Sequence, residues 1–399
     1  MSAVPAGYKQ TEVGVIPEDW AVRYLADVSR KITDGDHVTS LRTSHGYYLL
    51  SARNVLNGRI DVSDVDYVGA AEYRRMKQRC GPEAGDILIS CSGTIGRVAV
   101  VLSGFECVLV RSAALAKIDH GLADSVFLQF WLQGNKAQGQ IAGSVNQGAQ
   151  PNLFLNHIER LACPHPPLPE QRAIAAALSD VDALLAKLDQ LIAKKRDLKQ
   201  ATMQQLLTGQ TRLPGFHGEW EVRRLGAVCR ITIGKKDVNE GNPNGQFPFF
   251  TCSRTHTFSD SYSFDAEAIL IAGNGEVGNL HYINGKFEAY QRTYVLCAFS
   301  AHVRYLWQQL NAYLADSLGL GKIGSSIPYI KKENLIDFEF KSPRDTAEQT
   351  AIAEVLTEMD GELAALEQRR AKTPTLKQGM MQELLTGRTR LVSAEHVYA

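Results

Sequence analysis

The segment Glu170–Leu213, EQRAIAAALSDVDALLAKLDQLIAKKRDLKQATMQQLLTGQTRL, is repeated farther along the chain. Its second copy, Glu348–Leu391, reads EQTAIAEVLTEMDGELAALEQRRAKTPTLKQGMMQELLTGRTRL. The copies align without a gap at an offset of 178, and about 25 of their 44 positions are identical. Such self-similarity indicates an internal duplication, which constrains the architecture before any other argument.

Both copies carry the pattern of a long helix with a coiled-coil seam, in which apolar residues recur in alternating steps of three and four. These residues are Leu178, Val181, Leu185, Leu188 and Ile192 in the first copy, and Leu356, Met359, Leu363 and Leu366 in the second. Gly209 and Gly387 are placed to cap the helix ends. A helix over 169–207 would be roughly 58 Å long. Because Pro374 stands inside the second copy, we expect that helix to be bent or built of two segments.

Weaker similarity extends the duplication beyond the helices. Trp20-Ala-Val-Arg-Tyr-Leu25 matches Trp220-Glu-Val-Arg-Arg-Leu225, and Arg111–Leu115 matches Arg292–Leu296. The chain therefore divides into a first globular domain, a helix, a second globular domain and a second helix. The corresponding ranges are 1–165, 166–213, 214–345 and 346–399. Two seams in one chain most simply pair as an antiparallel coiled coil, acting as a structural hairpin, as a spacer between domains, or as both.

The globular domains read as mixed α/β, arranged as a pseudo-twofold tandem repeat. We expect strand pairs at Asp86–Ser90 with Arg97–Leu102 and at Ala266–Ile271 with Leu280–Ile283, and helices at Phe127–Leu132 and Val303–Leu314. Each strand pair encloses a glycine-rich turn, Ser-Gly-Thr-Ile-Gly in the first domain. Such turns are typical of hairpins, whereas their spacing is poor for a phosphate-binding loop.

The composition fits a globular protein of 399 residues, with 44% hydrophobic residues and a formal net charge of zero. Residues 17–160 contain 15 Lys and Arg against 15 Asp and Glu, so strong overall basicity is missing. Seven scattered cysteines without a CxxC pair indicate reduced thiols in the cytoplasm. Since no stretch of 18 apolar residues occurs, we expect neither a signal peptide nor a membrane span.

Motifs for catalysis are mostly absent from the sequence. It has no GxxxxGK[ST], no HExxH, no Cys/His cluster and no GxSxG. It also lacks the Asn-Pro-Pro-aromatic tetrad of amino-methyltransferases. Asp337, Glu339 and Lys341 could hold a metal as in a nuclease, but their alternation with Phe338 and Phe340 favours a half-buried strand. We therefore expect a binding and assembling protein without catalytic or metal-binding residues.

Several of these segments resemble the specificity subunit of type I restriction–modification systems. They are Tyr8–Trp20, Pro166–Ile174, the paired Trp-x-Val-Arg-x-Leu starts and the two Leu-Leu-Thr-Gly blocks. The resemblance covers nearly the whole chain, in order and in duplicate. It implies two target-recognition domains, each reading half of a split site on double-stranded DNA, with the helix pair setting the gap. It also implies methyltransferase subunits and a restriction and motor subunit as partners, which would bring S-adenosylmethionine and ATP with Mg²⁺.

Under this resemblance, base and phosphate contacts require polar or basic side chains on loops. The candidates are Arg42, Arg53, Asn54, Arg74, Arg75, Lys77, Arg79, Arg111, Arg254, Thr255, His256, Asn274, Arg292 and Lys322. Arg111 and Arg292 recur in both copies, which favours a role in the shared fold or at a phosphate. In the first copy, the end of the helix is followed by the segment that leads to Trp220. The repeat therefore also predicts that Tyr8–Pro17, which leads to Trp20, packs near the C-terminal helix.

Two other functions compete with this one. A coiled-coil scaffold with two protein-binding domains predicts no sequence-selective DNA binding, even with partners present. An enzyme using Asp337, Glu339 and Lys341 predicts metal-dependent strand cleavage by the isolated chain.

Overall fold

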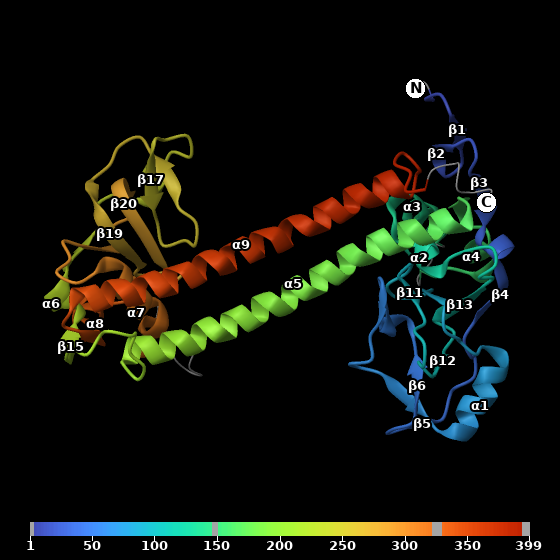
Figure 1. Ribbon diagram of the computed structural model, residues 1–399, viewed down its shortest axis with the longest axis horizontal. Helices are drawn as coiled ribbons and strands as arrows, with labels where there is room; N and C mark the ends of the chain where they lie inside the picture. Colours follow the sequence, from blue (N-terminus) through green and yellow to red (C-terminus); the bar gives the residue numbers. More distant parts are fainter. Residues whose placement is uncertain (1–3, 146–150, 321–328, 393–399) are drawn as a thin grey trace. The chain divides into compact units, whose positions relative to one another are not determined.

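The computed structural model of the chain describes residues 4–145, 151–320 and 329–392. It divides into two compact units (Figure 1). Unit 1 comprises Met1–Lys187 with Arg370–Ala399, and unit 2 comprises Leu188–Arg369. Both long helices, α5 (Leu168–Thr208) and α9 (Thr346–Leu384), contribute to both units.

The globular part of unit 1 is built on two four-stranded sheets, ordered β11-β10-β13-β4 and β12-β6-β9-β5. Smaller pairings join β1 to β2, β3 to β14 and β7 to β8. Its elements are β1 (Tyr8–Thr11), β2 (Gly14–Pro17), β3 (Ala21–Tyr24), η1 (Leu25–Val28), β4 (Ser29–Asp34), β5 (Arg42–Thr43), β6 (Tyr47–Leu50), η2 (Ala52–Asn54), β7 (Val55–Leu56), β8 (Arg59–Ile60), β9 (Asp66–Val68), α1 (Ala70–Arg79), β10 (Ile87–Ser90), β11 (Val98–Val100), β12 (Cys107–Leu109), β13 (Ala113–Ile118), α2 (Ser125–Gln133), α3 (Asn135–Ser144), α4 (Leu155–Glu159) and β14 (Ala162–His165).

The globular part of unit 2 is built on one six-stranded sheet with the order β16-β21-β19-β20-β17-β18. A separate pair joins β15 to β22. Its elements are β15 (Trp220–Arg224), α6 (Leu225–Val228), β16 (Arg230–Ile233), η3 (Val238–Glu240), β17 (Phe247–Phe250), β18 (Thr257–Ser259), β19 (Phe264–Ala272), β20 (Leu280–Ala289), β21 (Thr293–Cys297), α7 (Val303–Ser317), α8 (Lys332–Ile336) and β22 (Glu339–Pro343).

The expected strand pairs and helices of the globular domains are confirmed. β10 pairs with β11 and β19 with β20, both antiparallel, while α2 and α7 cover the predicted helical segments. Gly93 and Gly275 adopt positive φ, as do Gly96 and Gly278 at the far ends of the two turns. The turns are therefore equivalent hairpin connections, in which glycine supplies left-handed backbone conformations.

The strand registers correct one detail of the proposed repeat. Immediately after β10, the Cys91 amide donates to the carbonyl of Ser112; immediately after β19, the Gly273 amide donates to that of Arg292. Ser112 thus occupies the position of Arg292. The expectation that Arg111 and Arg292 are repeat equivalents is wrong by one residue. These short strands are largely apolar, so shifting one copy by one position against the other leaves the sequence pattern nearly unchanged.

The predicted helical seam is confirmed by burial. Leu178, Leu188, Ile192, Leu356 and Leu363 are buried, and the other four seam residues are partly buried. Within unit 1, Leu178 of α5 and Leu384 near the end of α9 belong to one apolar core. Within unit 2, Met203, Leu206 and Leu356 belong to another. In each unit, the start of one long helix therefore packs with the end of the other and with the globular domain.

Ion pairs between the long helices repeat in the two units. Lys377 contacts Asp182 at 2.6 Å in unit 1, and the equivalent Lys199 contacts Asp360 in unit 2. Helix α9 continues through Pro374, so of the two expected forms, a bent helix or two helical segments, the second is wrong. Packing along the helix supplies most helical stability in proteins and can offset the loss of one backbone hydrogen bond.

A buried ion pair closes each unit where the two long helices meet. In unit 1, Arg390 after α9 binds both carboxylate oxygens of Glu170 at the start of α5, at 2.5 and 2.8 Å. In unit 2, Arg212 after α5 binds Glu348 at the start of α9 in the same way, at 2.5 and 2.6 Å. Both glutamates are fully buried. The two pairs are separated by the repeat offset, so the same kind of ion pair is present at both junctions. Each of these ion pairs is called a helix lock below.

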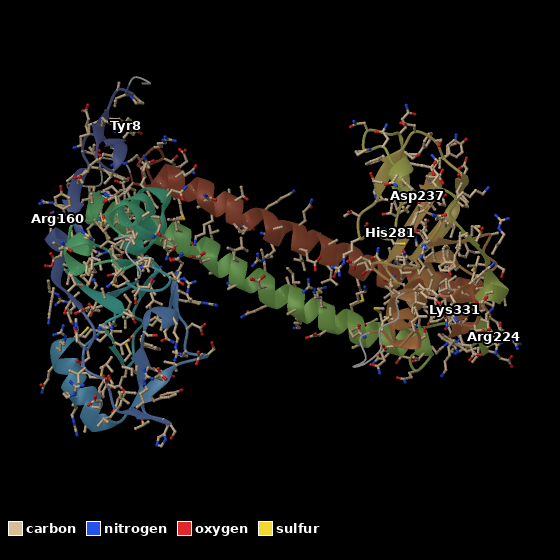
Figure 2. The ribbon with its side chains drawn as sticks, turned by 180° about the vertical axis from the view of Figure 1, so that it is seen from behind. Tyr8, Arg160, Arg224, Asp237, His281 and Lys331 are labelled. Atoms are coloured by element: carbon tan, nitrogen blue, oxygen red, sulfur yellow. The ribbon has the colours of Figure 1, made fainter. Side chains whose placement is uncertain are left out.

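The N-terminal segment packs beside the end of α9, as predicted. The Tyr8 hydroxyl, labelled in Figure 2, donates to the Gly387 carbonyl at 3.0 Å. Trp20 donates from Nε1 to Glu170 at 3.1 Å, and Asp19 pairs with Arg390 at 2.8 Å. Gly209 and Gly387 end the long helices at φ values of +72° and +69°, which confirms them as helix caps.

Candidate nucleic-acid interface

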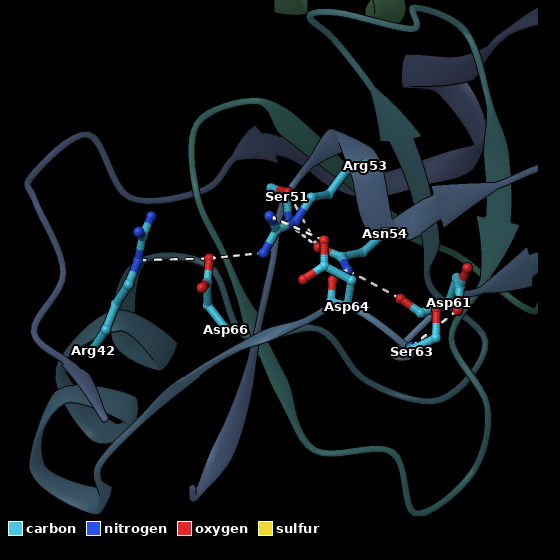
Figure 3. Close-up of polar contacts among 8 residues, drawn as sticks. All are labelled: Arg42, Ser51, Arg53, Asn54, Asp61, Ser63, Asp64 and Asp66. Atoms are coloured by element: carbon cyan, nitrogen blue, oxygen red, sulfur yellow. Dashed lines mark hydrogen bonds and ion pairs between the residues drawn. The ribbon is translucent and has the colours of Figure 1, made fainter. Parts of the chain in front are cut away.

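Two predicted arginines of the first domain form one cluster with acidic side chains (Figure 3). Arg53, in η2, lies 3.2 Å from Asp66 and 3.4 Å from Asp64. Arg42, in β5, lies 3.6 Å from the same oxygen of Asp66. The arginine side chains are 63% and 49% exposed for Arg42 and Arg53, so both remain accessible to a ligand.

Buried Asn54 holds the backbone segments that carry this cluster together. Its Oδ1 accepts hydrogen bonds from the amide and the hydroxyl of Ser51, and its Nδ2 donates to the carbonyls of Asp61 and Asp64. Asn54 is only 2% exposed. Its amide is therefore occupied by the fold, and we assign it a positioning role for Arg53 and Asp64 in place of the predicted direct contact with DNA.

The predicted basic run of residues 74–79 lies on α1, with four exposed cationic side chains. Arg75 binds Asp36 at 2.5 Å and Glu72 at 2.8 Å, and Arg79 binds Asp34 at 3.0 Å. These two arginines are thus paired with carboxylates of α1 itself and of the segment 34–36.

The other two cations of the run are held differently. Lys77 lies over the ring of Tyr73, 5.3 Å from its centroid. Arg74 has no ion pair among the residues described here. Lys77 and Arg74 are therefore the cations of α1 most available to a phosphate.

The Arg75 network shifts the titration of its carboxylates. Burial raises the pKa of Asp36, but the Val38 amide and the Arg75 guanidinium outweigh it and hold that pKa below its usual value. Hydrogen bonds from Arg75 likewise lower the pKa of Glu72. Both groups therefore stay ionised at neutral pH, and the Arg75 side chain is partly neutralised.

The predicted residues of the second domain lie around the ends of β17, β18 and β19. Arg254 is 81% exposed in its side chain and lies 3.2 Å from Glu276. Thr255 is exposed, and exposed His256 contacts the ring of Phe250 in a tilted geometry and that of Phe258 edge-on. Asn274 is half-buried and bridges to Tyr329 through the backbone. Lys322 lies outside the described residues.

Arg111 and Arg292 are both exposed, but at different positions of their domains. The Arg111 amide donates to the Asp36 carbonyl at 3.0 Å, directly beside the Arg75 network. The Arg292 carbonyl accepts from Gly273 and from the Cys252 thiol. Since the two side chains do not occupy equivalent sites, their roles have to be assigned separately.

The acidic residues that hold these arginines were missed in the sequence. Asp34, Asp36, Asp66 and Glu276 lie far along the chain from their partners, except for close neighbours such as Glu72. The available signal was the equal count of acidic and basic residues in the first domain, because such a domain has enough carboxylates to pair with its arginines.

The candidate metal set at Asp337, Glu339 and Lys341 forms no such site. Asp337 caps α8, while Glu339 and Lys341 are exposed on β22, with Phe338 and Phe340 buried. Arg224, labelled in Figure 2, pairs with Glu339 at 3.2 Å. Across the described ranges, no group of three or more His, Cys, Asp or Glu residues could hold a metal ion. The strand interpretation is confirmed for Glu339–Lys341, whereas Asp337 and Phe338 precede the strand.

No helix in the described part of the chain is long and apolar enough to cross a membrane. The duplicated scaffold defines the chain as a two-domain protein whose domains carry different exposed polar loops. Residues 17–195 and 217–373 each match the model of the type I restriction modification DNA specificity domain. The chain belongs to this family.

The chain is also similar to named members of the family. It is 34% identical over 168 residues to the type I restriction enzyme EcoDI specificity subunit of Escherichia coli, across 42% of this chain and 37% of that protein. It is 26% identical to the putative MjaX specificity subunit of Methanocaldococcus jannaschii, across 69% and 64% of the two chains. The chain thus spans less than two thirds of the length of either relative.

The fold is shared with a solved structure. The type I restriction–modification S subunit from M. genitalium superposes with a TM-score of 0.64 at 17% identity, across 92% of this chain and 96% of that one. This similarity establishes the mixed α/β fold with two long helices.

Proposed function

We propose that the chain is the DNA-specificity subunit of a type I restriction–modification complex. In this role it reads an asymmetric site on double-stranded DNA in two halves, one per domain, and does no chemistry itself. The observation that carries the proposal is the duplication: one scaffold with the same strand registers and the same helix locks bears two different sets of exposed polar residues. Different surfaces on equivalent frames imply two different half-sites.

The contacts that support DNA binding are the exposed cations of both domains. Arg42, Arg53, Arg74 and Lys77 would contact the first half-site, and Arg254 the second. Arginine and lysine donate to guanine in the major groove or to phosphates, so these side chains suit either target. Within the proposal, the equal numbers of acidic and basic residues in the chain mean that partner subunits supply part of the phosphate binding.

Recruitment of methyltransferase and restriction subunits forms the second part of the proposal. The seam residues such as Leu178 and Leu356 are buried, so they serve as the spacer and not as the recruiting surface. Leu198 and Leu376, separated by the repeat offset, are 52% and 61% exposed on the long helices. Two leucines exposed at equivalent positions of the repeat would dock two copies of one partner.

The proposed partners supply the cofactors and the chemistry. S-adenosylmethionine would belong to the methyltransferase subunits, and ATP with Mg²⁺ to the restriction and motor subunit. The proposed location is the cytoplasm, which suits the seven cysteines without disulfide bonds.

A methylation map tests this function. The chain is expressed with its methyltransferase subunit in a host free of DNA methylation, and modified bases are located by sequencing. A new split, asymmetric motif that depends on this chain is the expected result. If the two proteins are shown to be folded and associated but no motif appears, the scaffold function replaces the proposed one.

A further inference from the structure

Several of the predicted DNA-binding arginines, in both domains, are already paired with carboxylates of their own domain. Arg53 and Arg42 share Asp66, Arg75 binds Asp36, and Arg254 binds Glu276. This arrangement is the reverse of an ordinary phosphate-binding surface, where free cations release counterions from DNA. The pairing needs a physical explanation, because it partly neutralises side chains that would otherwise bind DNA.

Asp66 is the centre of the first-domain cluster. It lies on β9 beside Arg42 and Arg53 (Figure 3). Its side chain is 31% exposed, the least of the four charged side chains Arg42, Arg53, Asp64 and Asp66. One oxygen, Oδ2, lies 3.6 Å from Arg42 Nε and 3.2 Å from Arg53 Nη2. Each guanidinium has five N–H donors, so both arginines keep donors directed away from Asp66.

The cluster is built by the fold and not by chance encounter of long side chains. Buried Asn54 ties the backbone of Asp64 to the turn that carries Arg53. Asp64 adds a second carboxylate, 3.4 Å from Arg53. The arginines are therefore oriented before any ligand arrives, which lowers the entropic cost of using them.

A phosphate and a base edge meet this cluster differently. A phosphate brings a full negative charge next to the Asp66 and Asp64 carboxylates, so it must displace them or suffer repulsion. The major-groove edge of a G·C pair is neutral: guanine O6 and N7 accept from arginine, and cytosine N4 donates to a carboxylate. An arginine–aspartate cluster thus matches a G·C edge with both of its charges, while it disfavours phosphate.

We propose that Asp66 is a specificity-determining residue of the first half-site. It holds Arg42 and Arg53 away from phosphates and directs them, with its own carboxylate, to the edge of a G·C base pair. This inference rests on the proposed DNA-binding function and deepens it.

The test compares full-length variants assembled with the methyltransferase subunit. Asp66→Asn removes the charge and keeps the shape, and Asp64→Asn is a milder second variant at a side chain that is 84% exposed. Asp180→Asn is the matched control, since Asp180 is exposed on α5 and has no ion pair within the described residues. Affinity is measured against the mapped site, against sites altered in one half, and against random duplex, over a range of salt concentrations.

The expected result for Asp66→Asn is tighter binding to random duplex, with a salt dependence steeper by about 0.9 for each arginine freed to contact a phosphate. The preference for the intact first half-site should fall roughly tenfold or more, the discrimination that one good base contact supplies. The preference for the second half-site should stay unchanged. Asp64→Asn should shift binding in the same direction by less, and Asp180→Asn should match the wild type.

Two outcomes would overturn the inference while leaving the function intact. One is a wild-type preference for the mapped site that Asp66→Asn leaves unchanged. The other is loss of discrimination at both half-sites, or an equal effect of Asp180→Asn. A wild-type complex with no preference among the duplexes would instead remove the proposed function itself.

Discussion

The two helix locks differ in one bond, and this difference predicts unequal costs of breaking them. Among the described residues, Arg212 is the only side chain bonded to buried Glu348. Glu170 has a second donor besides Arg390, namely Trp20 Nε1 at 3.1 Å, whereas the corresponding nitrogen of Trp220 is buried without a partner. Arg212→Ala would therefore leave a buried carboxylate without any donor.

The magnitudes follow from the partners that remain. Removing one member of a buried ion pair costs about 3–5 kcal/mol, which is the expectation for Arg212→Ala. Arg390→Ala leaves the Trp20 bond in place, and a hydrogen bond to a charged group contributes about 1.5–3 kcal/mol. The cost of Arg390→Ala should therefore be smaller than that of Arg212→Ala by about this amount, reduced in part by the lost pairing with Asp19.

Hydrogen exchange followed by mass spectrometry is the suitable assay, because a chain with two units need not unfold in one step and exchange reports each segment separately. Peptides around Leu206–Trp220 and Thr346–Leu356 should exchange about 100-fold to a few thousand-fold faster in Arg212→Ala. Peptides around Leu384–Arg390 should accelerate less in Arg390→Ala. Equal effects, or a larger effect for Arg390→Ala, would refute the argument from the remaining donor.

Three further changes have defined outcomes. Asn54→Ala should destabilise the first domain by about 1–3 kcal/mol, since it strands the Ser51 amide and two carbonyls, and chemical denaturation followed by exchange in residues 51–64 measures this; an unaffected domain would contradict the positioning role. Asp36→Asn should remove an acid-sensitive contribution to stability: because the folded pKa lies below 3.8, the wild type keeps this contribution at neutral pH and loses it as the pH falls below 3.8, so acid unfolding curves of the two proteins should converge there. Leu198→Glu combined with Leu376→Glu should abolish co-purification of the methyltransferase subunit while circular dichroism stays unchanged, and retained binding would place recruitment elsewhere.

The sequence was sufficient for the architecture because the duplication is written in local patterns. The heptad leucines, the Trp-x-Val-Arg-x-Leu starts and the glycine turns each specify an element without reference to distant residues, and the structure contains all of them. Pro374 shows the limit of such reasoning: its local preference is to break a helix, but packing along α9 overrides that preference.

The site could be predicted only in part, because the missing information is long-range. The sequence identifies Arg42 and Arg53 as cations on loops, but Asp66 reaches them only through the pairing of β5 with β9. Asn54 was a candidate for base contacts because an asparagine amide can hydrogen-bond to bases, whereas its burial depends on the fold of residues 51–64. The one-residue error at Arg111 has the same origin, since register is set by hydrogen bonds between strands and not by composition.

The most direct test of the account is a methylation map made with Arg42→Ala and Arg53→Ala combined, the two arginines that the account directs to bases of the first half-site. Both substitutions lie in unit 1 and leave unit 2 untouched. The account predicts that modification becomes degenerate or weak at one half of the split motif, while the other half and the gap between them are retained. Equal loss at both halves, or an unchanged motif, would contradict the claim that each domain reads its own half-site.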